Sequence, residues 1–471
     1  MDGICSGAIL TRYLWNFTDN VYCIYSQRDK GHGISNQRVP NGMDLLILID
    51  SSTNDGKRCK ELKEQGLDII IIDHHVQTKE NNSALIVNNQ IDNYPNKYLS
   101  ASGLIYKVIQ VLDHELGTNY HENFIDLAGI GIYADVMSMR ELENRYFVSK
   151  ALKNIVNPGL KAIIKSNELT DLNSSTIGFT IAPVINAITR LGRIELAIEL
   201  MLEDDYKECL RLAKICKKLN EERKLIENKI YDSIKDRINT SNNIIIAVNE
   251  SNSIESGYLG LIATKIANNA KKPTLVVKYF QEEDMFRGSG RSFGSLKLRK
   301  FLKTTGLFDL LEGHEGAFGV AFKKDKLSSI VEIANKKLKV SKDSESTFEY
   351  DLEIDINDIT TKLVYEISEW NYLSGKDVPE ARILVKDVFV EDRRVMGKFN
   401  DTIKLKSNKL DIIKFRTTSD FADNIVGKKI NVIGNLSINK YFNWKERRNI
   451  YTNQMFLIDY KINMEEQTVF D

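Results

Sequence analysis

The residues from Leu67 to His75 place the strongest constraint on the fold. They read Leu-Asp-Ile-Ile-Ile-Ile-Asp-His-His, an apolar β-branched run that ends abruptly in an acid and two imidazoles. A run this short and this rich in isoleucine predicts a buried strand of a parallel sheet. Ligands of open α/β sheets bind beyond the carboxyl ends of the strands, so Asp73, His74 and His75 are expected where chemistry takes place. On this tripeptide alone, a loop with two solvated histidines is an equally good interpretation.

Three other segments place a carboxylate in a similar position, and these carboxylates are Asp2, Asp50 and Asp135. The runs before Asp50 and Asp135, the latter over residues 126–134, have strand-like composition. Asp2 lies in a Gly-rich turn before an apolar helix expected over Ser6–Leu14. Buried acids would repel one another unless a cation neutralised them. Carboxylate oxygens and imidazole suit Mn²⁺ or Mg²⁺ better than a tetrahedral zinc cage, so the sequence predicts a metal site.

The motifs Asp2-Gly3, Asp50, Asp73-His74-His75 and Asp135 together resemble those of the DHH phosphoesterase superfamily. The closer resemblance is to the RecJ-type single-strand-specific exonucleases, and it extends through most of the chain. Further stretches that look like the family's occur in the same order, and these are Gly31-His32-Gly33, Leu99–Gly103, Glu143–Arg145, Pro183–Ala187, Arg190–Gly192, Gly288–Ser292, Gly313-His314 and Ala317–Gly319.

The resemblance implies roles for the site residues. Asp50 is expected to bridge two ions of Mn²⁺ or Mg²⁺, one of which Asp2, His74 and Asp135 would complete. His75 is expected to contact the scissile phosphate or help the leaving group, while Asp73 orients the turn.

The amino terminus departs from the family pattern. The family motif is Asp-x-Asp-Gly, and Met1 stands here at the x position, so the leading acid and its strand are absent. We expect that Met1 is an internal methionine of a longer reading frame or that the protein was truncated. The alternative is divergence that leaves one metal site degraded.

The order of elements predicts an α/β protein in four parts. Residues 1–150 would form a parallel-sheet DHH domain, 151–240 a helical connector, 241–340 a second α/β domain of the DHH-associated type, and 347–471 an OB-like β-barrel. Expected strands of the first part are Val21–Tyr25, Leu45–Ile49, Ile69–Ile72 and Ala84–Val87, with a helix over Ala101–Leu112. Later elements are one long helix from about Glu195 to Ile238, strands Ile244–Val248 and Thr274–Val277 around helix Leu259–Asn268, a linker over Lys337–Ser346, and strands Arg382–Val390, Thr402–Lys406, Leu410–Arg416, Lys429–Leu436 and Gln454–Ile462.

Two further groups of residues are candidates for nucleic-acid binding. The stretch Arg287–Lys303 is Gly-rich and basic, and arginine pairs well with phosphate oxygens. With the family motifs nearby, the expected phosphate-binding residues are Arg190, Arg291, Ser292, Gly313 and His314. An aromatic and basic loop near the carboxyl end could stack bases, through Tyr441, Phe442, Trp444 and Arg447. An aromatic hairpin that packs on its neighbour is nearly as good an interpretation of that loop.

Composition sets the remaining expectations. Formal net charge is zero, so any DNA contact must come from local patches. Five cysteines without a CxxC pair, no signal peptide and no apolar run of membrane length favour a cytoplasmic protein with reduced thiols and no membrane contact.

The resemblance implies stepwise hydrolysis of single-stranded DNA from its 5′ end by a monomer, with a single-strand-binding protein or helicase as a possible partner. The alternatives are a DHH phosphoesterase for oligoribonucleotides or cyclic dinucleotides, and a catalytically silent DNA-binding relative. The additional barrel disfavours the first alternative, and the other motif acids disfavour the second.

Overall fold

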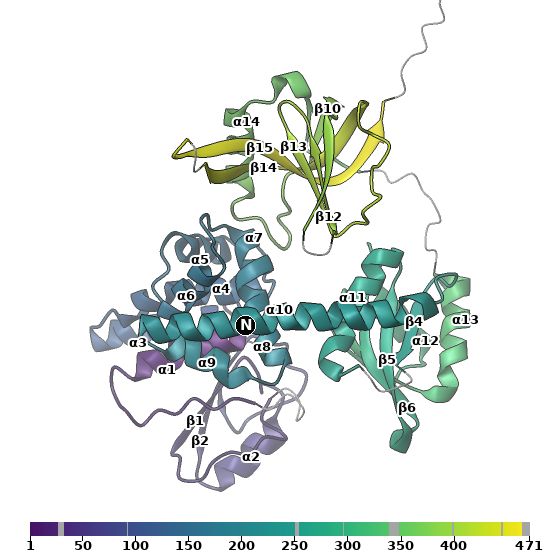
Figure 1. Ribbon diagram of the computed structural model, residues 1–471. Helices are drawn as coiled ribbons and strands as arrows, with labels where there is room; N and C mark the ends of the chain where they lie inside the picture. Colours follow the sequence, from purple (N-terminus) through teal and green to yellow (C-terminus); the bar gives the residue numbers. More distant parts are fainter. Residues whose placement is uncertain are drawn as a thin grey trace, which may run out of the picture. The chain divides into compact units, whose positions relative to one another are not determined.

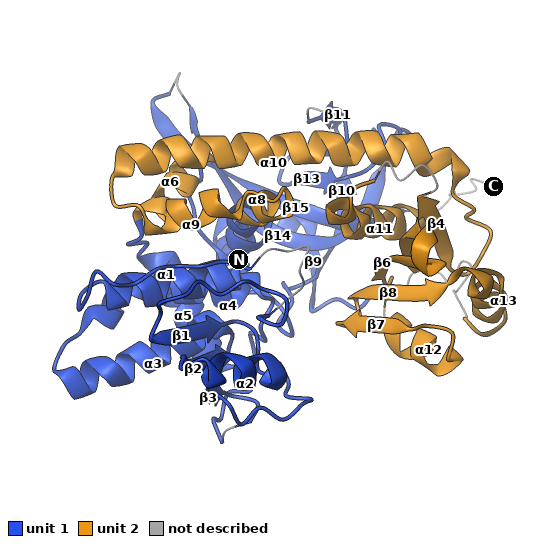
Figure 2. Ribbon diagram, turned by 90° about the horizontal axis from the view of Figure 1, so that it is seen from below, with its two compact units in different colours: residues 1–157, 169–182, 346–471 blue, residues 158–168, 183–345 orange. Residues whose placement is uncertain are grey.

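The computed structural model describes residues 1–26, 33–91, 93–249, 254–294, 296–338, 348–397, 400–443 and 446–463. His32 and Trp444, which the sequence singles out, lie outside these described residues. The chain divides into two compact units (Figure 2). One unit comprises residues 1–157, 169–182 and 346–471, and the other comprises residues 158–168 and 183–345.

A three-stranded parallel sheet positions the motif residues of the first unit (Figure 1). Its strands lie in the order β1 (Leu45–Ile49), β2 (Asp68–Asp73) and β3 (Leu85–Asn88), which confirms three of the strands expected from the sequence. Helix α2 (Gly56–Glu64) packs on one face, where Cys59 and Leu62 join Ile69 and Ile71 in a buried cluster. Because all three strands are parallel, their carboxyl ends lie at one edge, and Asp73 pairs in register with Asn88.

Helices complete this part of the unit, and they are α1 (Asp2–Leu14), α3 (Ala101–Leu116), α4 (Ile125–Ala134), α5 (Leu142–Lys153) and the single turn α7 (Ser174–Thr176). Helix α4 packs against α1, α3 and α5. The expected helix over 101–112 is confirmed and runs one turn further. Helix α1 begins at Asp2, four residues earlier than expected, so Asp2 lies in its first turn instead of in a preceding loop.

Two expected strands of this unit are wrong. Residues 126–134, taken as strand-like, belong to helix α4, because an apolar run without a polar face fits a buried helix as well as a buried strand. Residues 21–25 form no strand, although their composition favours one. Within the described residues no strand pairs with the outer edge of β1, so this segment has no partner in the sheet.

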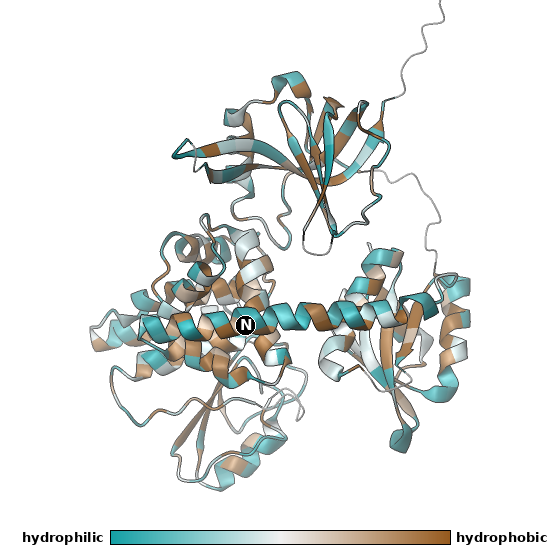
Figure 3. Cartoon of the chain, viewed as in Figure 1, coloured by the Kyte–Doolittle hydropathy of each residue, from teal (hydrophilic) through white to brown (hydrophobic). Residues whose placement is uncertain are grey.

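The second unit begins with helices that lead into a mixed sheet. The helices are α6 (Pro158–Ser166), α8 (Ala182–Arg190), α9 (Ile194–Leu202) and α10 (Tyr206–Ile234). The single helix expected from about 195 to 238 is therefore wrong, because the chain is extended at Glu203 and Asp205 caps a new helix by accepting a hydrogen bond from the Lys207 amide. Figure 3 shows hydrophilic and hydrophobic bands alternating along α10, as expected of a helix with one packed face.

The mixed sheet of the second unit has the order β4-β5-β6-β8-β7. Its strands are β4 (Ile245–Asn249), β5 (Thr274–Phe280), β6 (Met285–Arg291), β7 (Leu310–Gly313) and β8 (Ala317–Lys323), and its helices are α11 (Ser256–Ala270), α12 (Leu298–Thr305) and α13 (Leu327–Lys337). The predicted strands at 244–248 and 274–277 and the helix between them are confirmed. The Gly-rich stretch from Arg287 to Arg291 is a strand, because each glycine lets a neighbouring backbone or ring approach: a Cβ on Gly288 would lie 2.0 Å from the Val276 carbonyl.

The carboxyl-terminal part of the first unit is built on a seven-stranded sheet, in the order β11-β12-β13-β15-β14-β10-β9. Its elements are β9 (Leu352–Asp355), α14 (Thr361–Asn371), β10 (Ile383–Phe389), β11 (Asp392–Met396), β12 (Thr402–Lys406), β13 (Asp411–Phe415), β14 (Lys429–Asn443) and β15 (Arg448–Ile462). All five strands expected here are present, while β9, β11 and α14 were not predicted. Residues 441–443 belong to β14 and pair with residues 448–450 of β15, so these aromatic residues lie on a hairpin, the alternative interpretation of this segment, and not in a loop. Among the described residues, no helix combines the length and apolar character needed to cross a membrane.

A buried carboxylate joins helices α1 and α3. Asp113 is 1% exposed and accepts hydrogen bonds from the Tyr13 hydroxyl at 3.1 Å and from the backbone amide of His121 at 2.7 Å. The Thr118 hydroxyl and the His121 Nδ1 also bond to it. Burial opposes the charge of Asp113, but these hydrogen bonds outweigh it and hold the pKa of the carboxyl below its usual range.

We expect Asp113→Asn to lower the free energy of unfolding by about 1–3 kcal/mol at neutral pH, because buried donors lose a charged acceptor. The folded pKa lies below the unfolded one, so this stabilisation is present above about pH 3.9 and is lost as the pH falls through the folded value. Hydrogen exchange of peptides from α1 and α3 measures the effect. Glu115→Gln, which neutralises an exposed acid of the same helix, is the control, and equal exchange in both variants would contradict the assignment.

Candidate metal centre and phosphate-binding residues

Residues from four separate segments meet at the carboxyl edge of the parallel sheet. The Nε2 atom of His74 lies 3.3 Å from Asp50 Oδ1 and 3.4 Å from Asp135 Oδ2. Asp2, His74 and Asp135 offer ligand atoms that all lie within 4.8 Å of one another, and so do Asp50, His74 and His75. The structure thus brings together all four predicted metal ligands, although Asp135 follows a helix and not a strand.

Asp2 is held by the amino terminus of helix α3. Its carboxylate is 4% exposed and accepts hydrogen bonds from the Ser100 hydroxyl at 2.9 Å and from the backbone amides of Ala101 and Ser102 at 2.9 and 3.2 Å. Unpaired amides and the helix dipole both favour a negative charge at this position. The same contacts fix the direction of the carboxylate before any ligand arrives.

Two glycines allow the carboxylates to come this close. A Cβ on Gly131 of α4 would lie 2.2 Å from the Ser102 hydroxyl and 2.8 Å from Asp2 Oδ1. A Cβ on Gly3 would lie 2.9 Å from Asp50 Oδ2. The backbone also departs from its usual range beside the acids, since Asp50 has φ +56° and the β-branched Val136 has φ +57°.

Asp73 shapes the turn that carries the two histidines. Its carboxylate is 1% exposed and accepts hydrogen bonds from the amides of His74 and His75 at 2.8 and 3.2 Å, and from the Thr53 hydroxyl at 2.6 Å. The Nδ1 of His75 lies 2.7 Å from the same carboxylate. Burial would raise the pKa of Asp73, but the hydrogen bonds from His75 and Thr53 outweigh it and hold that pKa well below its usual range.

Thr53 and Asn88 also belong to the site, and sequence reasoning missed them. The Asn88 amide donates to the Thr53 hydroxyl at 3.0 Å and to the His75 carbonyl at 2.9 Å. Both residues lie at the carboxyl edge of the sheet, since Thr53 follows β1 and Asn88 ends β3. That position beyond a predicted strand was the signal that could have identified them.

The crowded acids perturb one another's protonation. Burial and the nearby Asp50 raise the pKa of Asp2, while burial and the nearby Asp2 raise the pKa of Asp135 to about 7. Burial disfavours the charged imidazole of His74, but the surrounding carboxylates outweigh it and raise the pKa of His74 to about 9. The arrangement therefore favours any positive charge placed between the acids.

The geometry fits a divalent cation. The Nε2 atom of His74 is buried and, although it lies 3.3 Å from Asp50, no described residue meets it in hydrogen-bond geometry. An orphaned imidazole nitrogen among carboxylate oxygens is a mixed nitrogen and oxygen donor set, which suits Mn²⁺ and Mg²⁺. Metal coordination would satisfy the nitrogen and neutralise the acids at once.

The predicted phosphate-binding residues lie around helix α11 and the sheet of the second unit. Arg291 ends β6, and its Nε donates to the Thr264 hydroxyl at 3.0 Å while one terminal nitrogen donates to the Gly290 carbonyl at 2.7 Å. A Cβ on Gly260 would lie 2.5 Å from the other terminal nitrogen, so the guanidinium approaches α11 closely at this glycine. A terminal nitrogen of Arg190 lies 3.5 Å from the Gly257 carbonyl in the first turn of α11.

Ser292, Gly313 and His314 meet at the β7–β8 turn. The Ser292 hydroxyl donates to the Glu315 carbonyl at 3.0 Å, and the His314 amide donates to the Ala317 carbonyl at 3.1 Å. Gly313 has φ +123°, which the turn requires of a glycine. Arg291 pairs with Ala317 in register, so these residues and Arg291 form one neighbourhood.

The carboxyl-terminal candidates lie at the tip of the β14–β15 hairpin. Tyr441 and Phe442 are 46% and 44% exposed, and Arg447 occupies the turn with φ +50°. Half-exposed aromatic rings on a hairpin are available for stacking.

Comparisons with known proteins agree with this architecture. The model for the DHH family, N-terminal domain, matches residues 1–132, and the model for the RecJ OB domain matches residues 350–452. The putative SPbeta prophage-derived single-strand DNA-specific exonuclease YorK of Bacillus subtilis is 30% identical over 483 residues, which cover 94% of this chain and 83% of the relative. The single-stranded-DNA-specific exonuclease RecJ of Bacillus subtilis is 28% identical, with coverage of 94% and 59%.

Solved structures share the fold. RecJ from Thermus thermophilus in complex with Mn²⁺ matches with a TM-score of 0.74 at 22% identity, over 98% of this chain and 67% of that one. The length and identity of the match to the prophage-derived relative, together with the DHH and RecJ OB domains, show that this chain belongs to the RecJ family of DHH proteins.

Proposed function

We propose that this chain hydrolyses phosphodiester bonds of single-stranded DNA in a metal-dependent reaction, as an exonuclease that works from the 5′ end. The observation that carries the proposal is the convergence of Asp50 and Asp135 on the buried Nε2 of His74, with Asp2 in the same group of possible ligands. The names of the similar proteins, single-stranded-DNA-specific exonucleases, support the substrate. The polarity comes from the resemblance to that family.

Asp2, Asp50, His74 and Asp135 would hold Mn²⁺ or Mg²⁺ in this proposal. When bound, such an ion supplies Lewis acidity, which polarises the phosphoryl oxygen and acidifies water. The His75 ring is oriented by Asp73, which also stabilises its charged form: this hydrogen bond raises the pKa of His75 against the opposing effect of burial. A charged imidazole at this position can contact the scissile phosphate or protonate the leaving oxygen.

Binding of the DNA strand would involve the other candidate residues. Donors for backbone phosphates would come from Arg190, Arg291, Ser292, Gly313 and His314. Rings and a charge for bases of the strand would come from Tyr441, Phe442 and Arg447.

We further propose that residues 1–150, 151–240, 241–340 and 347–471 act as the four parts expected from the sequence. The five cysteines are free thiols, which supports a cytoplasmic protein, and we propose that it acts as a monomer beside a single-strand-binding protein or helicase.

The first prediction from this proposal concerns nuclease activity and compares substitutions of two acids that flank strand β1, Asp50 and Asp44. Asp50→Ala is expected to lower the rate of degradation of 3′-labelled single-stranded DNA in Mn²⁺ by about 100-fold or more, since even residues that merely support metal ligands cost about 10–100-fold. Asp44→Ala, an exposed acid at the opposite end of the same strand, should leave the rate unchanged. Binding of DNA without degradation by the unsubstituted chain would contradict the proposal.

The metal prediction concerns His74. The unsubstituted chain should bind Mn²⁺, and His74→Ala should weaken this binding because the mixed donor set loses its nitrogen. Electron paramagnetic resonance of free Mn²⁺ during a titration without DNA measures the Mn²⁺ affinity of the unsubstituted chain and of His74→Ala. His114→Ala, at a histidine whose side chain is 86% exposed, is the control, and equal affinity in all three proteins would exclude His74 as a ligand.

The phosphate prediction concerns the support of Arg291. Thr264→Val removes the oxygen that accepts the Arg291 Nε hydrogen bond, and we expect KM for DNA to rise by about 5- to 10-fold while kcat changes little. Thr264→Ser retains the hydroxyl and should restore KM. An unchanged KM in Thr264→Val would show that the direction of Arg291 does not matter for binding.

A further inference from the structure

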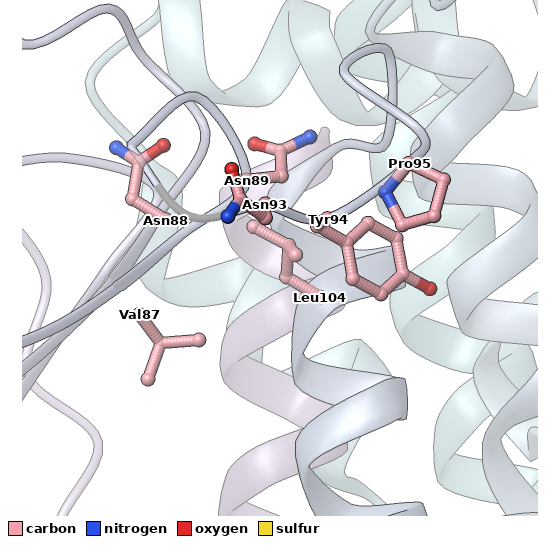
Figure 4. Close-up of a pocket in the computed structure, with 7 residues that line it drawn as sticks. All are labelled: Val87, Asn88, Asn89, Asn93, Tyr94, Pro95 and Leu104. Atoms are coloured by element: carbon pink, nitrogen blue, oxygen red, sulfur yellow. The ribbon is translucent and has the colours of Figure 1, made fainter.

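We propose that a cavity at the carboxyl end of strand β3 receives one base of the bound DNA strand. The cavity has a volume of about 320 Å³ and is drawn in Figure 4. It lies wholly within the first unit and is separate from the metal ligands. The proposal rests on the proposed function, because it assigns a subsite for that single-stranded substrate.

The cavity lies next to the turn formed by Asp73, His74 and His75. Asn88 lines it, and Asn88 pairs in register with Asp73 on the adjacent parallel strand, where neighbouring strands are about 4.8 Å apart. The Asn88 amide also donates to the His75 carbonyl and to the Thr53 hydroxyl. Asn88 therefore lines the cavity and also contacts the Asp-His-His turn, so a nucleotide adjoining the scissile phosphate is within reach.

The lining suits a flat, neutral group. Tyr94, Pro95 and Leu104 contribute apolar surface, and Asn88, Asn89 and Asn93 contribute amides. Figure 4 shows the rings of Tyr94 and Pro95 on one side and the amide of Asn88 on the other. None of the described residues that line the cavity is charged, which disfavours a phosphate and favours a base that can stack on a ring. The volume falls within the range of about 300–1,000 Å³ that is usual for small-molecule sites.

Asn89 supplies an unused acceptor. It is 1% exposed, and its amide nitrogen donates to the carbonyls of Asn96 and Leu99 at 3.0 and 3.1 Å, which fixes the orientation of the amide. Its Oδ1 is buried and has no partner among the described residues. A buried acceptor without a donor costs stability, and every DNA base carries an N–H on its Watson–Crick edge that could bond to it. The site would therefore accept any of the four bases.

The wall of the cavity is fixed before binding. The Tyr94 hydroxyl donates to Glu143 Oε1 at 2.7 Å, and the Asn96 amide donates to the other oxygen of Glu143 at 3.1 Å and to Asn144 Oδ1 at 3.0 Å. A preformed ring and amide lose little conformational freedom when a base enters.

The test removes one base from the DNA, blocks the cavity by a substitution, and asks whether the two changes affect Kd independently. Single-stranded oligonucleotides with a 3′ fluorophore carry one abasic residue at successive positions from the 5′ end, and anisotropy gives Kd for the full chain bearing Asp50→Ala, which keeps the DNA intact. We expect one position at which loss of the base raises Kd by about 5- to 10-fold. Adding Asn93→Trp, which places a bulky ring at an exposed lining position, should weaken binding of the intact strand and abolish that penalty.

Asn82→Trp is the matched control, because Asn82 is an exposed asparagine in the loop before β3 and does not line the cavity. It should leave both Kd and the abasic penalty unchanged, and circular dichroism checks that each variant is folded. An equal abasic penalty with and without Asn93→Trp overturns the base subsite while leaving the exonuclease proposal intact. Failure of every form of the chain to bind DNA overturns both.

Discussion

Three carboxylates and an imidazole share a volume that cannot hold their charges without compensation. Asp2 and Asp135 have raised pKa values because burial and the neighbouring carboxylates oppose a further negative charge. The fold supplies part of the compensation through the amino terminus of α3, whose amides bond to Asp2. The proposed cation would supply the rest of the compensating positive charge. Its position between the acids is maintained by the carboxyl edge of the sheet, by the packing of α4 against α1 and by the glycines that permit this packing.

Much of this arrangement could be predicted from local sequence. Strands β1, β2 and β3 are short apolar runs of strand length, rich in Ile and Val in β2 and β3, and the acids and histidines that end or follow β1 and β2 mark the functional edge. Helix α4 could not be distinguished from a strand, because its apolar residues are buried on every side and leave no periodic polar face. Residues 21–25 show a different difficulty. Their composition favours a strand, but a strand also needs a neighbouring strand to pair with, and composition does not reveal whether one is present.

The supporting residues were harder to predict than the ligands. Threonine and asparagine are common at the ends of strands and in loops, so residue type alone does not mark Thr53 and Asn88 as special. Their importance depends on their hydrogen bonds to the Asp73–His75 turn. Arg291 was found by motif, but its placement in strand β6 and its contact with Thr264 depend on glycines that let α11 approach. In each case the signal lies in pairs of residues far apart in the sequence.

The left-handed backbone at Val136 has a consequence for how such a protein could change over time. A β-branched residue at φ +57° costs energy that a glycine or asparagine would not, so these two substitutions are expected to stabilise the fold against heat. A glycine at position 136 would hold the same backbone angle at lower cost, so the heat resistance of this segment could rise while the adjoining Asp135 kept its direction.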